Sequence, residues 1–159
     1  STGGVPKPCS NYPDDAELVK TAAALAVEEV QHFRRVFSIL ERRGLPLAGR
    51  RKNPWIQALR ARIEVGREPW TKVDRLLFGA MVEARSCERF TCLLQVIDDA
   101  EVRTLLADLG PAEKRHWLTF RALAERDLPR ELVEIRWRGW LEFERDLAQN
   151  LGTTPTVHG

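Results

Sequence analysis

Long apolar runs and paired cysteines are both missing from this 159-residue sequence. No segment approaches the roughly 18 apolar residues that a membrane-spanning helix needs, and no secretory signal peptide is recognisable at the start. The three cysteines contain no Cys-x-x-Cys pair, which is typical of reduced thiols. These absences favour a cytoplasmic protein with no membrane segment and no structural disulfides.

Glycine and proline are also scarce outside a few short connections, and no alternating strand pattern of useful length occurs. Hydrophobic residues make up 43% of the chain and charged residues 30%, which is typical of a globular protein with a sizeable core. The formal net charge is only +2, but most of the positive charge is arginine, which suits phosphate contacts better than lysine does. The composition predicts an all-α domain.

Helical periodicity and capping residues divide the chain into five expected helices. They cover approximately residues 14–43, 53–65, 71–97, 100–126 and 129–150. We expect residues 1–13 to be an irregular leader, 14–150 a single domain and 151–159 a loose tail. Long helices with short connections predict an up-down bundle.

Carboxylates and histidines interrupt the apolar stripes of three of these helices. Glu29 and His32 stand on the stripe of the first helix, and Glu113 and His116 stand on the stripe of the fourth. Glu83, in the stretch EARSCERF, interrupts the long third helix. A buried carboxylate is costly unless it is paired or binds a metal. Three helices with the same interruption therefore suggest one shared site.

Both Glu-x-x-His pairs have the spacing that places a carboxylate oxygen and an imidazole nitrogen on one helix face. Two such pairs, with one further carboxylate from each of two other helices, form the di-iron or di-manganese site of ferritin-like bundles. A single pair is common on helix surfaces and would mean little. Two of the three histidines in the chain follow the pattern, which favours metal binding.

A faint internal repeat predicts where the remaining carboxylate should lie. AVEEVQHFRRVFSILER resembles GPAEKRHWLTFRALAER, and in each the liganding Glu precedes a Glu-Arg pair by 12 residues (41 − 29 and 125 − 113). Glu83 precedes Glu113 by 30 residues, so the partner of Glu29 would fall at about position −1. The repeat therefore predicts a helix with a fourth carboxylate that this sequence does not contain.

The motifs VEEVQHFRRVFSILERRGLPL, VDRLLFGAMVEARSCERF and AEKRHWLTF resemble the tRNA 2-methylthio-N6-isopentenyladenosine hydroxylases, often called MiaE. EARSCERF is the most distinctive of them. The resemblance covers about residues 17–126 and implies a ferritin-like bundle with two non-haem iron ions. The iron ligands that it implies are Glu29, His32, Glu83, Glu113 and His116. The family's first core helix has no counterpart here, so the resemblance implies that this helix is supplied from elsewhere.

The resemblance also implies an activity, which is hydroxylation of the isopentenyl group of a modified adenosine in tRNA. Dioxygen is the expected co-substrate, and an external donor of the ferredoxin or reductase type is the expected source of electrons. The only tyrosine, Tyr12, lies outside the expected bundle, which disfavours a tyrosyl-radical role. Two alternatives stay open: a di-iron oxygenase that acts on a small molecule, and a degenerate, non-enzymatic bundle.

A basic loop is the candidate contact for tRNA. Arg50, Arg51 and Lys52 could follow the phosphate backbone, and Trp55 or Trp70 could stack on an unpaired base. A solvated helix face with both tryptophans packed inward is the alternative interpretation.

Overall fold

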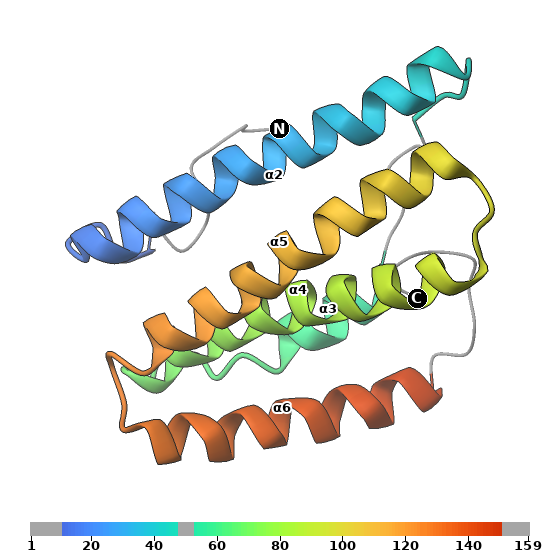
Figure 1. Ribbon diagram of the computed structural model, residues 1–159. Coiled ribbons are helices and arrows are strands. Elements are labelled where there is room, and N and C mark those ends of the chain that lie inside the picture. The colour runs from blue at the N-terminus through green and yellow to red at the C-terminus, as the bar shows by residue number, and fades with distance from the viewer. Residues whose placement is uncertain (1–10, 48–52, 151–159) are drawn as a thin grey trace. The chain divides into compact units, whose positions relative to one another are not determined.

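The computed structural model describes residues 11–47 and 53–150, and five helices lie within them (Figure 1). They are α2 (Ala16–Arg42), α3 (Pro54–Ala61), α4 (Trp70–Val96), α5 (Ala100–Ala124) and α6 (Arg130–Asn150). The chain divides into two compact units, Ser1–Arg50 and Arg51–Gly159. The first unit contributes α2, and the second contributes the other four helices.

Helix α2 begins and ends where the sequence predicts. The side chain of Asp15 caps its N-terminus by accepting a hydrogen bond of 3.0 Å from the amide of Leu18. At the other end Gly44 has a φ of 64°, a left-handed conformation that glycine adopts without steric cost. The amide of Leu45 there donates to the carbonyl of Leu40 at 2.9 Å, which stops the helix.

In the second unit, α4 and α5 form an antiparallel pair joined by a three-residue connection. Figure 1 shows α3 and α6 running alongside this pair, and α6 contacts both α3 and α4. Asp99 in the connection caps α5 by accepting from the amide of Val102 at 3.0 Å. The core of this unit consists of side chains that are at most 7% exposed, and its largest members include Trp55, Leu59, Leu76, Leu77, Met81, Val133 and Trp140.

Helix α3 is shorter than the sequence predicts: it ends at Ala61 rather than near residue 65. The segment after it is held in a loop by the fully buried carboxylate of Asp74 on α4. One Asp74 oxygen accepts from the amide of Glu64 at 2.8 Å, and both oxygens accept from the Arg136 guanidinium at 2.7 and 2.8 Å. The indole of Trp140 donates to the same carboxylate at 3.2 Å. These contacts fix α6 and the loop to α4.

Helix α5 runs through Pro111 as a single helix, although proline lacks the amide that would donate one turn back. The single helix that the sequence predicts over this stretch is therefore present. Glu113 and His116 consequently lie on the same uninterrupted helix as the core residues Leu105 and Leu109. This continuity sets their register against α4.

The all-α class is confirmed, since the described residues form five helices and no strand. None of the helices in residues 11–47 and 53–150 is long and apolar enough to cross a membrane. Residues 1–10 of the expected leader at 1–13, and the tail at 151–159, lie outside the described residues, and the domain boundaries that the sequence suggests stay a prediction.

Candidate metal centre

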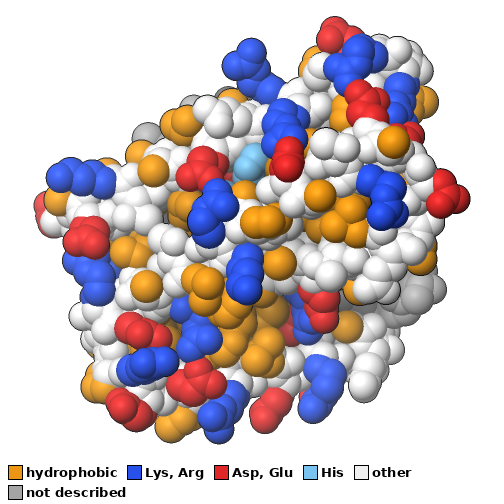
Figure 2. Space-filling view, in the orientation of Figure 1, with side chains coloured by type: hydrophobic (Ala, Val, Ile, Leu, Met, Phe, Trp, Pro, Cys, Tyr) orange, Lys and Arg blue, Asp and Glu red, His pale blue; other side chains and the backbone are white. Residues whose placement is uncertain are grey.

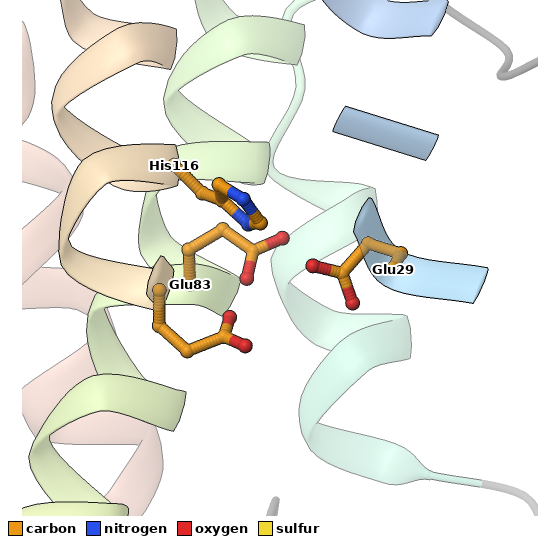
Figure 3. A group of neighbouring side chains, drawn as sticks. Glu29, Glu83 and His116 are labelled. Carbon is orange, nitrogen blue, oxygen red and sulfur yellow. The ribbon is translucent and has the colours of Figure 1, made fainter. Parts of the chain in front are cut away.

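Glu83, Glu113 and His116 come together between α4 and α5. Each offers one possible ligand atom, and these atoms lie within 4.8 Å of one another. Figure 3 shows the Glu83 carboxylate and the His116 ring directed toward the same space. The single carboxylate of the third predicted helix and the Glu-x-x-His pair of the fourth are thus neighbours, as the stripe pattern indicates.

The site is sheltered from water. Glu113 is 4% exposed and His116 is 2% exposed, while Glu83 is half-buried. Two carboxylates this close repel each other in a poorly solvated place, and a cation between them would offset that cost.

Cys87 lies one helical turn after Glu83 and close to the Glu113 carboxylate. Burial raises the pKa of the Cys87 thiol, and the nearby Glu113 carboxylate raises it further. The sulfur is therefore kept as a neutral thiol beside the carboxylates.

Glu29 and His32 lie on one face of α2, in the other unit. The His32 Nδ1 atom is 3.3 Å from a Glu29 carboxylate oxygen, with His32 15% and Glu29 46% exposed at the side chain. The i,i+3 spacing thus brings carboxylate and imidazole together in α2. The predicted liganding role of all five residues stays a prediction.

The charged residues of EARSCERF other than Glu83 turn toward α6 and α3. The Arg85 guanidinium bridges the Glu88 carboxylate and the fully buried carboxylate of Glu144. Burial opposes the charge on Arg85, but its hydrogen bonds to both glutamates outweigh burial and raise its pKa. The Trp55 indole also donates to Glu144, at 3.1 Å. Arg85 therefore ties α4 to α6.

Of the residues predicted to contact RNA, the structure describes the two tryptophans but not the basic loop. Arg50, Arg51 and Lys52 lie outside the described residues. Trp55 is 1% exposed and hydrogen-bonded through its indole, so it is a core residue and has no face open to a base. Trp70 is half-buried, with the Arg136 guanidinium 5.5 Å from its ring centre.

The sequence analysis missed Asp74 and Glu144, although both are buried carboxylates on apolar stripes. The stripe rule that singles out Glu83 would also have found them. Asp74 pairs with Arg136, and Glu144 pairs with Arg85. Their role is to join helices.

The donor set of the Glu83 cluster fits a divalent transition metal. Carboxylates are hard oxygen donors that suit iron and manganese, and imidazole is a common ligand for iron. The positions of the three donors also suit one metal ion, because they come from two adjacent, well-packed helices.

The helices and this donor set define a ferritin-like helical bundle with a candidate metal centre. A solved structure described as "Protein 43 with aldehyde deformylating oxygenase activity from Synechococcus" resembles the chain with a TM-score of 0.86 and 29% identity. The match covers 96% of this chain and 74% of that one.

More specifically, the chain belongs to the family described as tRNA-(MS[2]IO[6]A)-hydroxylase (MiaE), whose model matches residues 9–159. The match includes α6 as well as the motifs of the first four helices.

Two curated relatives carry the name tRNA 2-(methylsulfanyl)-N(6)-isopentenyladenosine(37) hydroxylase. The protein of Salmonella typhimurium is 33% identical over 144 residues, which is 88% of this chain and 51% of the relative. The protein of Pseudomonas putida is 35% identical over 115 residues, which is 72% of this chain and 55% of the relative. The chain thus spans about half the length of the curated relatives that it matches.

Proposed function

We propose that this protein is a dioxygen-dependent, non-haem di-iron monooxygenase that hydroxylates the isopentenyl group of a modified adenosine in tRNA. The observation that carries the proposal is the cluster of Glu83, Glu113 and His116 in a chain that belongs to the MiaE family. Both curated relatives are named for this reaction. A cytoplasmic location follows from a tRNA substrate.

We assign the metal ligands to two groups. Glu83, Glu113 and His116 hold one side of the centre, and the α2 pair of Glu29 and His32 holds the other. The support for the second group is the matched spacing of its two donors and their contact on one face of α2. When bound, the iron pair would activate dioxygen, so that one oxygen atom enters a C–H bond and the other leaves as water, reduced by the two electrons of the external donor.

A fourth carboxylate is assigned to a helix that is not part of these 159 residues. Helix α2 supports this assignment, because its exposed apolar side chains include Val30 at 59%, Phe33 at 55% and Phe37 at 37%. Phe33 and Phe37 stack on each other with ring centres 6.1 Å apart. An exposed apolar face of this kind is typical of a helix that packs against a further partner.

The protein's own residues would orient the prenyl group and exclude water. Ala80 is fully buried, and Gly79 lets the Phe120 ring lie so close to α4 that an added Cβ would be 3.2 Å from it. Gly79 and Ala80 lie on α4, which carries Glu83, and Phe120 lies on α5, which carries His116. Phe33, which we also predict for the apolar wall, is exposed on α2. Electrons come from an external ferredoxin-type donor.

The test uses the purified protein with ferrous iron, a chemical reductant and tRNA that carries the isopentenyl modification. We expect the modified nucleoside to gain one oxygen atom by mass spectrometry, and labelled dioxygen to transfer its label. Glu113→Gln should abolish the gain, whereas Glu142→Gln, an exposed control on α6, should retain it. Oxygen that came from water instead would contradict the proposal.

An oxygenase that acts on a small aldehyde is the second candidate, and the likeness to the Synechococcus structure favours it. The same preparation distinguishes a tRNA hydroxylase from an aldehyde oxygenase. An aldehyde oxygenase would convert an added aldehyde without labelling the tRNA nucleoside, and tRNA would not inhibit that conversion.

A further inference from the structure

Helix α5 carries a strip of side chains that the metal centre does not use. Lys114, Trp117 and Arg121 follow one another at steps of three and four residues, so they lie along one side of the helix. Trp117 directly follows the candidate ligand His116 in the chain. Lys114 is exposed, while Trp117 and Arg121 are half-buried.

The strip meets Trp137 of α6. The indole rings of Trp117 and Trp137 are nearly parallel, at 7°, with centres 6.2 Å apart. The Arg121 guanidinium carbon lies 5.9 Å from the Trp117 ring centre and 5.6 Å from the Trp137 ring centre. Trp137 is 6% exposed, so the more accessible Trp117 is the outer ring of the pair.

The surroundings are apolar and positively charged. Leu118 on α5 and Leu141 on α6 are 45% and 37% exposed. Figure 2 shows hydrophobic side chains gathered between α5 and α6, with lysine and arginine side chains beside them. The Glu134 carboxylate forms ion pairs with Arg121, at 2.7 Å, and with Arg138, at 3.2 Å. These four residues have a net charge of +2, because Lys114, Arg121 and Arg138 are positive and Glu134 is negative.

We propose that Trp117, with Lys114 and Arg121, is the surface on which an unpaired anticodon-loop base stacks while the neighbouring modified adenosine reaches the metal centre. This inference rests on the proposed function and adds the RNA-contacting residues to it. Unpaired RNA bases are recognised by stacking on aromatic rings and guanidinium planes, and nearby cations bind the phosphates. The strip combines all three groups within about two helical turns.

The assignment differs from the basic loop that the sequence suggests. Trp55, the aromatic residue closest to that loop, is buried in the core. Trp117 combines partial exposure with adjacency to a candidate ligand.

The test measures binding of a fluorescent anticodon stem-loop RNA by anisotropy at several salt concentrations. Base stacking on one aromatic ring contributes about 1–3 kcal/mol, so we expect Trp117→Leu to weaken binding by about 5- to 150-fold. Trp117→Phe keeps an aromatic face and should remain close to the wild type. Circular dichroism and metal content check that each variant is folded.

Lys114 provides a second variant that leaves the tryptophan pair intact. Lys114→Ala should lower the slope of log affinity against log salt by about 1, since it removes one phosphate contact. Arg115→Ala is the matched control, because Arg115 is the next residue, is exposed and points about 100° away around the helix. Its slope should stay within error of the wild-type slope.

The outcomes separate the inference from the function on which it rests. Weaker binding by Trp117→Leu and a lower slope for Lys114→Ala support the inference. If a folded Trp117→Leu binds like the wild type, or if Lys114→Ala matches Arg115→Ala, the surface is wrong, whereas RNA hydroxylation by the wild type would keep the function intact. A wild type that binds and hydroxylates no RNA overturns both. When Trp117→Leu fails to fold, the Lys114 comparison decides.

Discussion

Replacing Glu113 by glutamine should make the metal-free protein more stable while removing its response to metal. The ligand atoms of Glu83 and Glu113 lie within 4.8 Å of each other, and Glu113 is 4% exposed. Two unit charges 4.8 Å apart repel by about 3.5 kcal/mol at an effective dielectric constant near 20, and screening by solvent lowers this value. Because Glu83 is only half-buried, we expect a gain of about 1–2 kcal/mol in the free energy of unfolding.

Urea denaturation in the presence of a chelator measures this gain. With a slope near 2 kcal/mol per molar urea, the midpoint should rise by about 0.5–1 M. Saturating ferrous or manganous ion should then stabilise the wild type by about 2.7 kcal/mol at one hundred times the dissociation constant, and Glu113→Gln by much less. The order of the two midpoints should therefore reverse on addition of metal.

Glu142→Gln is the control, because Glu142 is an exposed carboxylate on α6. Its midpoint should shift by the equivalent of about 0.5 kcal/mol or less, with and without metal. A Glu113→Gln protein that is less stable than the wild type in chelator would refute the reasoning, since the repulsion between the two carboxylates would then not be the dominant effect. Equal stabilisation of both proteins by metal would refute it as well.

Three further predictions concern groups around the centre. Asp74→Ala should cost about 3–5 kcal/mol of unfolding free energy by urea denaturation, because it breaks the ion pair with Arg136 and leaves the Trp140 indole and the Glu64 amide without their acceptor; a loss below 1 kcal/mol would contradict this. Asp99→Ala should cost about 1 kcal/mol in the same measurement, since it removes the N-cap of α5, and Asp99→Asn should restore most of that loss. Cys87 should react with iodoacetamide near pH 8 more slowly than the exposed Cys92, because its raised pKa leaves less thiolate; peptide mass spectrometry measures both rates, and a faster Cys87 would contradict the direction of the shift.

The helices were predictable because their signals are local. Asp15, Asn53 and Asp99 act as N-caps at the positions where a short polar side chain precedes an apolar pattern. The end of α3 was not predictable in this way. It depends on Asp74, which comes ten residues after Glu64 and accepts the hydrogen bond from its amide. A tertiary contact of that kind leaves no local signal.

The α4–α5 part of the site was predictable from the stripe rule, which places Glu83 and His116 toward the core. The rule could not separate a ligand from an internal ion pair. Glu144 occupies the same kind of position, and only the structure pairs it with Arg85 and Trp55. The decisive information is which arginine reaches which carboxylate, and that depends on how the helices pack.

The most direct test of the metal centre is anomalous scattering at the iron edge, on crystals of the protein grown with ferrous iron. We predict two peaks about 3.5–4 Å apart, as in other two-metal sites. One should be ligated by Glu113 and His116 and the other by Glu29 and His32, with Glu83 contributing an oxygen to the centre. A single peak held only by the α4–α5 residues, with His32 directed elsewhere, would contradict the account.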